Sequence, residues 1–292
     1  MSSEGPAHPS TLGPVALASV QVDLTTRLGA PSEVTPTGFR GLDTLLHGGL
    51  RSGSVLAIAG APGSGRTSLA LMIAYMAART QAGVELVGRG LDDTEVVARL
   101  AARALRRTYP ESEVTYADIW SGNAYANDTV RRAVGEAVDT VLQKVGAHLH
   151  ITRLGPGDSL ETFAPRSTQL WARYDRVVMV VDDLEGLTAG VGIAPLDARM
   201  LSAAYELRSL AEQGCAVVFT VLARNAELVA PATTAMVELR PSGSADRWGP
   251  GSTPGGTNGP VELDLVVTKN RVGPTGRVPV RVLFAACEFT EP

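Results

Sequence analysis

The chain has 292 residues, of which 45% are hydrophobic and 19% are charged, and its formal net charge is −4. This length and apolar content suffice for one large α/β domain with tails. The acidic balance argues against indiscriminate coating of nucleic acid. No apolar stretch reaches the length of a membrane span, and the first residues lack a signal sequence. Cys215 and Cys287 lie in apolar, strand-like runs, which predicts buried, reduced thiols and a cytoplasmic location.

Residues 1–36 are rich in Pro, Ser, Gly and Thr, which predicts a flexible N-terminal arm. Over residues 37–289, apolar runs of strand and helix length alternate, which predicts an α/β domain whose mainly parallel sheet is flanked by helices. Strands are expected at 54–59, 83–88, 147–152, 176–182, 215–221, 235–239, 261–269 and 277–285. Helices are expected at 41–47, 67–80, 92–107, 126–144, 159–172 and 196–213. Residues 241–260 have the Gly, Ser and Pro content of a flexible loop.

The segment Gly60-Ala-Pro-Gly-Ser-Gly-Arg66-Thr67 joins the first core strand to its helix, which is the context of a phosphate-binding loop. Its glycines let backbone N–H groups turn inward around a polyphosphate, and the helix N-terminus adds a partial positive charge. Thr67 is placed to offer its hydroxyl to Mg²⁺. Arg66 replaces the usual lysine with a wider, planar cation, which is not a conservative change. We expect ATP to be bound by Gly60, Pro62, Gly63, Ser64, Gly65, Arg66, Thr67 and Ser68.

An apolar run at residues 177–181 ends in two carboxylates, Asp182 and Asp183. A parallel strand buried on both faces ends in this way when its tip meets water or a cation. Beside a phosphate-binding loop, an aspartate at such a tip holds Mg²⁺ through its water shell. We therefore assign the metal to Thr67 and Asp182. Asp183 fits a cap on the following turn equally well.

Two further segments resemble the DnaB-like family of bacterial replicative helicases. Lys269-Asn-Arg271-Val-Gly-Pro-Thr-Gly276 resembles the family's basic hairpin, and residues 37–50 resemble its approach to the phosphate loop. Other RecA-like ATPases share the approach, so the hairpin is the more specific of the two. The resemblance covers about 37–289 and implies the family's C-terminal motor domain. It therefore implies a RecA-like P-loop NTPase domain that ends in a β-hairpin.

The resemblance also implies an ATP-dependent DNA helicase or translocase that works as a hexameric ring on single-stranded DNA. In the family, nucleotide lies between neighbouring subunits, so Arg66, Thr67 and Asp182 would bind Mg-ATP within one subunit. The same resemblance implies that Lys269 and Arg271 reach the γ-phosphate of the neighbour's nucleotide. An arginine that reaches in this way neutralises charge on the transferred phosphoryl group. Catalytic roles are thereby implied for Arg66, Asp182, Lys269 and Arg271.

The chain departs from the family at four points. Arg66 replaces a lysine, Gly90 replaces the catalytic glutamate and Val221 replaces a nucleotide-sensing glutamine, while residues 225–234 lack the basic residues of the DNA-contacting loop. A glycine cannot orient or deprotonate water. Phosphate contacts supply most non-specific DNA affinity, so the fourth departure argues against a strand gripped in the ring. The departures predict weakened hydrolysis. Four nearby carboxylates could substitute for the missing catalytic glutamate: Glu85, Asp92, Asp93 and Asp183.

Two functions from different classes remain open at this point. The first is the helicase or translocase that the family implies. The second is a non-motor regulatory or assembly subunit of the same fold, which would offer Arg271 to the nucleotide of a related ATPase in a hetero-oligomer. A RecA-like signalling ATPase is a third interpretation, but it leaves the Gly-Pro-Thr-Gly hairpin unexplained.

Overall fold

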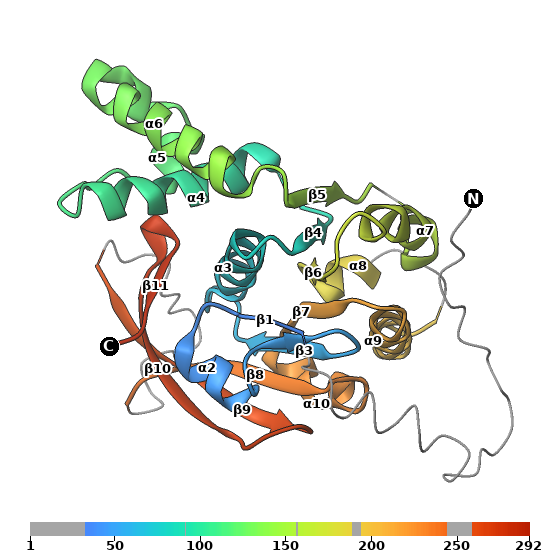
Figure 1. Ribbon diagram of the computed structural model, residues 1–292. Helices are drawn as coiled ribbons and strands as arrows, with labels where there is room; N and C mark the ends of the chain where they lie inside the picture. The colour runs from blue at the N-terminus through green and yellow to red at the C-terminus, as the bar shows by residue number, and fades with distance from the viewer. Residues whose placement is uncertain (1–32, 91, 156, 189–193, 244–258) are drawn as a thin grey trace, which may run out of the picture. The chain divides into compact units, whose positions relative to one another are not determined.

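One nine-stranded sheet carries the candidate site, in a computed structural model that describes residues 33–90, 92–155, 157–188, 194–243 and 259–292 (Figure 1). The strand order is β11-β10-β9-β8-β3-β7-β6-β4-β5. The strands are β3 (Val55–Gly60), β4 (Gly83–Gly88), β5 (Leu149–Arg153), β6 (Val177–Val181), β7 (Ala216–Leu222), β8 (Ala235–Pro241), β9 (Val261–Asn270), β10 (Gly276–Leu283) and β11 (Glu288–Thr290). A separate two-stranded sheet pairs β1 (Val34–Thr35) with β2 (Leu50–Arg51).

The sheet is parallel from β8 to β5 and antiparallel from β8 to β11. Every residue of β3 and β6 is buried, as expected for parallel strands covered on both faces. In β10 buried and exposed residues alternate, which is typical of an antiparallel strand with one solvated face. The predicted mainly parallel sheet and the predicted C-terminal hairpin, formed by β9 and β10, are both confirmed.

Helices cover both faces of the parallel part of the sheet, and the first helix contacts β9 and β10 of the antiparallel part (Figure 1). They are α2 (Arg40–Leu45), α3 (Arg66–Arg79), α4 (Asp93–Thr108), α5 (Tyr116–Trp120), α6 (Asp128–Val145), α7 (Leu160–Trp171), α8 (Leu184–Thr188), α9 (Leu196–Glu212) and α10 (Ala226–Val229). Short 3₁₀ turns include η3 (Ala223–Asn225), η4 (Ala230–Ala232) and η7 (Phe284–Ala286). The six helices expected from the sequence are all present, with ends displaced by a few residues.

Side-chain alternation along β3 divides the core in two. Ile58 points to the face covered by α3, where it joins Leu69 and Ile73. The neighbouring Ala57 and Ala59 point to the opposite face, which α9 covers through Met200 and Leu207. Successive strand residues face opposite sides of a sheet, so one apolar strand supplies both halves of the core. A smaller third cluster holds α4, α5 and α6 together.

The C-terminal tail fastens the segment that leads to the phosphate loop. Glu291 accepts hydrogen bonds from the backbone N–H groups of Arg40 and Gly41, both at 2.7 Å, and so satisfies the first turn of α2. Thr37, which precedes α2, is held by Asp43 of that helix: the Asp43 carboxylate accepts a hydrogen bond from the Thr37 N–H at 2.8 Å. Of the predicted arm, residues 1–32 lie outside the described residues, as do residues 244–258 of the predicted loop.

Candidate nucleotide-binding site

The loop between β3 and α3 has a backbone that only glycine accommodates at two points. Gly65 caps α3 with a φ of 92°, in the left-handed region. A Cβ at Gly65 would lie 2.3 Å from the ring of Phe284, and one at Gly60 would lie 2.3 Å from Ser64 Oγ. These close approaches let the loop fold tightly over the first turn of a 14-residue helix, whose free N–H groups and dipole favour an anion.

Two polar groups of this loop are buried without a hydrogen-bond partner among the described residues. They are the hydroxyl of Ser64 and the Nη1 group of Arg66. Most buried polar groups in proteins are paired, because an unpaired one forfeits its hydration. One group is a hydroxyl and the other is cationic, and both lie at a helix N-terminus. This donor set fits the oxygens of a polyphosphate.

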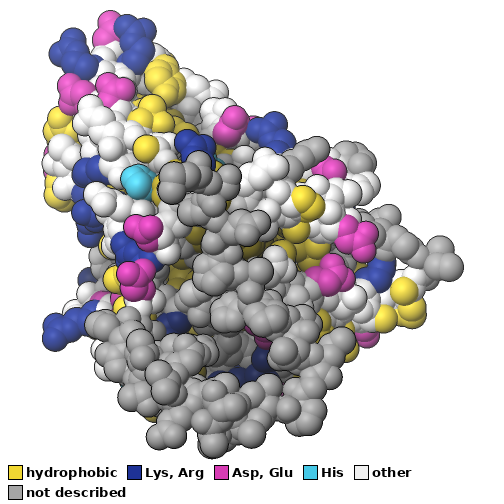
Figure 2. Space-filling model, turned by 45° about the vertical axis from the view of Figure 1, so that its right-hand side comes forward, with side chains coloured by type: hydrophobic (Ala, Val, Ile, Leu, Met, Phe, Trp, Pro, Cys, Tyr) yellow, Lys and Arg dark blue, Asp and Glu magenta, His cyan; other side chains and the backbone are white. Residues whose placement is uncertain are grey.

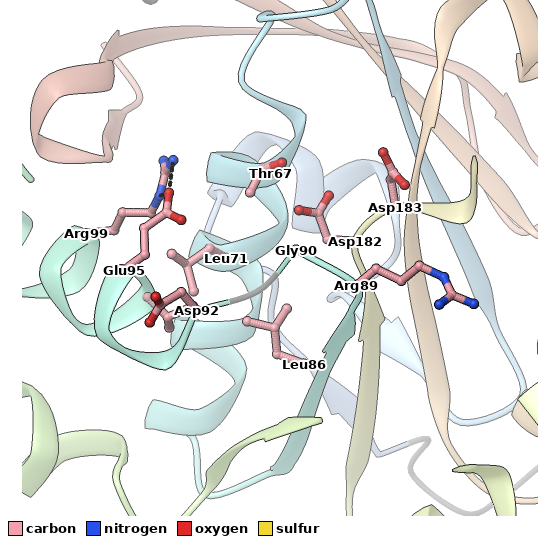
Figure 3. A pocket seen from close by; sticks show the side chains of 11 residues that line it. Thr67, Leu71, Leu86, Arg89, Gly90, Asp92, Glu95, Arg99, Asp182 and Asp183 are labelled. Carbon is pink, nitrogen blue, oxygen red and sulfur yellow. Dashed lines mark hydrogen bonds and ion pairs between the residues drawn. The ribbon is translucent and has the colours of Figure 1, made fainter. Parts of the chain in front are cut away.

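Asp182 follows β6 and lies beside the first turn of α3. The strand between β3 and β6 is β7, and its Thr220 hydroxyl donates to Asp182 Oδ1 at 2.6 Å. Burial raises the pKa of Asp182, while hydrogen bonds from Thr220 and Thr67 act in the opposite direction. Figure 3 shows the Thr67 and Asp182 side chains directed toward one another. A hydroxyl and a carboxylate are oxygen ligands of the kind that Mg²⁺ prefers, so the pair fits this metal.

Two cavities flank the start of α3. The first, of about 280 Å³, is lined by Thr67, Leu71, Leu86, Arg89, Gly90, Asp92, Glu95, Val96, Arg99, Asp182 and Asp183 (Figure 3). The second, of about 360 Å³, is lined by Gly63, Gly65, Arg66, Thr67, Ser68, Arg99, Thr115, Tyr116, Ala117, Phe284 and Ala285. Thr67 and Arg99 line both cavities. The fold therefore brings most of the predicted loop residues to the second cavity and Asp182 to the first, and Thr67 lines both.

Asp92 and Asp93 start α4 at the edge of the first cavity. Asp92 is the N-cap of α4 and accepts from the Thr94 N–H at 2.8 Å, and backbone hydrogen bonding lowers its pKa. Asp93 accepts from the same N–H at 2.9 Å and pairs with Arg153 at 3.0 Å. Both carboxylates thus hold the helix start.

Asp183 and Glu85 also accept hydrogen bonds that stabilise the fold. Asp183 Oδ1 accepts from the Gly186 N–H at 2.5 Å and caps the first turn of α8, which is the capping role that the sequence left open. Glu85 is buried in the middle of β4 and accepts from the Thr152 hydroxyl at 2.6 Å. It does not line either cavity.

Arg89 has a role that the sequence did not predict. Its half-buried guanidinium donates to three backbone carbonyls: Gly186 at 2.6 Å, Gly155 at 2.5 Å and Asp158 at 2.7 Å. These carbonyls belong to α8 and to the segment between β5 and α7. Arg89 therefore ties the carboxyl ends of β4, β5 and β6 together beside Gly90.

The two basic residues of the β9–β10 hairpin differ in their surroundings. Lys269 Nζ donates to the carbonyls of Ala230 and Thr233, the latter at 2.8 Å, and burial lowers its pKa. Arg271 is exposed and donates to the Pro231 carbonyl at 2.9 Å. The turn itself rests on α2, because Asn270 donates to the Leu45 carbonyl at 2.8 Å. Within this chain the hairpin thus holds η4 and α2.

The segment that corresponds to the family's nucleotide-sensing and DNA-contacting region, for which the sequence predicts loss of both roles, is folded onto the sheet. Val221 is fully buried in β7, so it presents no polar group to the site. The segment that follows forms η3, α10 and η4, and residues 225–234 contain no lysine or arginine. On the face seen in Figure 2, acidic and basic side chains are interspersed over the described residues. Among those residues, no helix is long and apolar enough to cross a membrane.

Arg99 and Glu95 are two further residues of the site that sequence reasoning missed. They lie one turn apart on α4, and Arg99 donates to Glu95 Oε1 from Nε at 3.0 Å and from Nη2 at 2.7 Å. The guanidinium also lies over the Tyr116 ring, 4.1 Å from its centroid. An i, i+4 Glu–Arg spacing was the available signal. That spacing is common on solvated helix faces, so it does not single out a site.

These features define a RecA-like P-loop nucleotide-binding protein. The sequence model of the DnaB-like helicase C-terminal domain matches residues 35–248, well over half of the chain, and the chain belongs to this family. One solved structure, of an ATPase domain, aligns over 96% of this chain and 100% of its own, at 16% identity and a TM-score of 0.74. A second solved structure, of a DnaB-like replicative helicase and its interactions with primase, aligns over 95% of this chain and 67% of its own. The identity is again 16% and the TM-score 0.74. No curated protein sequence matches the chain.

Proposed function

We propose that this chain is a ring-forming, DnaB-like helicase or translocase domain that binds Mg-ATP at Gly60–Ser68 and hydrolyses it slowly. The observation that carries the proposal is that Thr67 and Asp182 face each other beside a glycine-rich loop. In the part of the chain that the structure describes, the Ser64 hydroxyl and Arg66 Nη1 of this loop have no partner. Mg²⁺ would be held by Thr67 and Asp182 and would neutralise charge on the phosphate oxygens. Arg66 would add its charge on the same side.

The proposed ring places the hairpin of one subunit against the nucleotide of the next. Arg271 suits this role because its side chain is exposed. Lys269 would first have to leave the carbonyls of Ala230 and Thr233, so its contribution would be to hold η4. The ring could be homo-oligomeric or could include a related ATPase. Its location would be the cytoplasm, in keeping with the two buried free thiols.

Slow hydrolysis is proposed because the position of the family's glutamate offers no side chain. A Cβ at Gly90 would meet no atom within 4 Å, so the space for a side chain exists but is not used. The neighbouring Asp92 and Asp93 are engaged at the start of α4. Single-stranded DNA would be held weakly, because residues 225–234 carry no basic side chain. The family match favours this weakened motor over a non-motor subunit.

Replacing Thr67 tests the proposed site. Titration of fluorescent ATP should show weaker binding by Thr67→Ala than by the unmodified protein when Mg²⁺ is present, and equal binding in EDTA. Thr67→Ser keeps the hydroxyl and is the matched control. Mass photometry with and without Mg-ATP would report whether rings form. If Thr67→Ala leaves the magnesium-dependent titration unchanged, the nucleotide binds elsewhere.

A further inference from the structure

We propose that Glu95 positions the attacking water during the residual ATP hydrolysis, in place of the side chain missing at Gly90. This inference rests on the proposed function, since it requires Mg-ATP in the loop at Gly60–Ser68. Glu95 is the third residue of α4 and lines the 280 Å³ cavity together with Thr67 and Asp182. In Figure 3 its carboxylate lies beside the Arg99 guanidinium, across the cavity from Thr67 and Asp182.

The orientation of the Glu95 carboxylate is fixed by one residue. Both hydrogen bonds from Arg99 go to the same oxygen, Oε1, at 3.0 and 2.7 Å. Arg99 is itself held, because its guanidinium lies 4.1 Å from the Tyr116 ring centroid and Nη1 lies 3.3 Å from the hydroxyl of Ser68. Its side chain is only 16% exposed. Among the described residues, Arg99 is the hydrogen-bond partner of the Glu95 carboxylate and it contacts Oε1, so Oε2 can accept a hydrogen bond in the cavity.

The other acidic side chains that line this cavity have competing tasks. Asp182 is assigned to the metal and accepts from Thr220. Asp92 caps α4, and Asp183 caps α8. Glu95 is bound through a side chain instead of a backbone N–H, so its position is set by the same Arg99 that reaches Ser68 of the phosphate loop. This link connects the carboxylate to the loop that would hold the nucleotide.

The chemical step needs only water and ATP. The water oxygen bonds to the γ-phosphorus, and the bond from that phosphorus to the bridging oxygen breaks with its electron pair leaving on ADP. Glu95 Oε2 accepts a hydrogen bond from the water, and both protons of the water end on the released phosphate, which leaves as H₂PO₄⁻. Glu95 thus orients the water through Oε2 while Arg99 holds Oε1.

The test compares Glu95→Gln with Glu212→Gln in single-turnover hydrolysis of radiolabelled ATP and in equilibrium binding of fluorescent ADP. Glu212 forms the same kind of i, i+4 pair, with Arg208 on α9, at a distance of 3.1 Å. We expect Glu95→Gln to slow hydrolysis on the order of 100-fold with the nucleotide Kd unchanged, because the carboxylate that positions the attacking water is lost. Glu212→Gln should leave both quantities unchanged. Adding Gly90→Glu to Glu95→Gln should restore hydrolysis, because the new side chain enters open space on the same cavity wall.

The outcomes separate this inference from the proposed function. If Glu95→Gln hydrolyses ATP at the unmodified rate, or if the unmodified protein binds nucleotide but releases no phosphate, the role of Glu95 is wrong and the binding site stands. If the unmodified protein binds no nucleotide, the proposed function itself is wrong. Equal melting temperatures of Glu95→Gln and Glu212→Gln would show that lost folding is not the cause of a slow rate.

Discussion

The start of α3 and the start of α4 lie on either side of one cavity but are built differently. At the start of α3, the Ser64 hydroxyl and the Arg66 Nη1 group have no protein partner among the described residues, and the backbone is shaped by glycines at close approaches. At the start of α4, the side chains of Arg89, Asp92 and Asp93 are engaged in structural hydrogen bonds. The first region leaves its donors available to a ligand, whereas the second uses Arg89, Asp92 and Asp93 to hold the fold.

This contrast separates binding from turnover within a single site. Phosphate binding depends largely on backbone N–H groups and a helix N-terminus, which the Arg66 substitution leaves in place. Hydrolysis also needs a side chain that orients water, and the family's position for that side chain, just after β4 on the cavity wall, is Gly90. A RecA-like domain can therefore keep one property while weakening the other.

The largest effect should come from adding a side chain at Gly65 in the phosphate loop. Gly65→Ala places a methyl group 2.3 Å from the Phe284 ring at a φ of 92°. We expect Mg-ATP affinity to fall on the order of 100-fold, equivalent to about 3 kcal/mol of clash and backbone strain. Gly53→Ala is the control, because Gly53 has a φ of 81° but no atom within 4 Å of a Cβ. Equal affinity of the two variants would contradict the proposed loop geometry.

Removing Arg89 tests the structural character of the second region. Arg89→Met loses three hydrogen bonds from a charged donor, and we expect the free energy of unfolding in urea to fall by about 3 kcal/mol. The exposed Arg153 is the control, since its surface pair with Asp93 is worth less than about 1 kcal/mol. An Arg89→Met protein as stable as Arg153→Met would show that Arg89 does not hold these strand ends.

Restoring the family's residues at positions 66 and 90 should separate the effect on nucleotide binding from the effect on turnover. Arg66→Lys alone should change ATP turnover little, because the group that orients water would still be absent at Gly90. Arg66→Lys combined with Gly90→Glu should raise kcat on the order of tenfold, with a smaller change in Kd. Steady-state release of phosphate measures the first quantity, and titration of fluorescent ATP measures the second. A full gain from Arg66→Lys alone would locate the defect in the phosphate loop instead of at Gly90.

The smallest expected effect is on the free energy of unfolding, which the buried charge of Asp182 lowers. Burial raises the pKa of Asp182, so the folded protein disfavours its charged form. We expect Asp182→Asn to raise the free energy of unfolding at pH 7 slightly in the absence of nucleotide, while weakening Mg-ATP binding. The gain should vanish below the ordinary pKa of aspartate, where both side chains are neutral, and grow as pH rises toward the raised pKa of Asp182. Urea unfolding at several pH values would measure it, and a loss of stability at pH 7 would contradict it.

Continuous apolar runs and glycine spacing predicted the fold well. The run ending at Asp182 and the loop before Thr67 could be placed at one sheet edge because parallel strands present their carboxyl ends together. The short elements β1, α5, α8, α10 and β11 were not predicted, since so few residues cannot show a helical or strand period.

Contacts between distant residues could not be read from the sequence either. The Glu291 carboxylate that completes α2 lies 250 residues from Gly41. The carbonyls that bind Arg89 belong to two segments with no sequence signal for this role. Glu95 resembles any helix-surface glutamate until the structure shows which cavity it lines. Patterns local to one element predict that element, whereas the site also depends on which elements meet.

The central claim is that binding is kept while turnover is weakened, and it is tested most directly by measuring both on one unmodified sample. Mg-ATP affinity from equilibrium titration should be saturable and dependent on Mg²⁺. The turnover of the same sample, with and without single-stranded DNA, should be well below the roughly 1 s⁻¹ at which typical enzyme kcat values begin, with little stimulation by DNA. Brisk, DNA-stimulated hydrolysis that unwinds a forked duplex would contradict this account, as would the absence of any nucleotide binding.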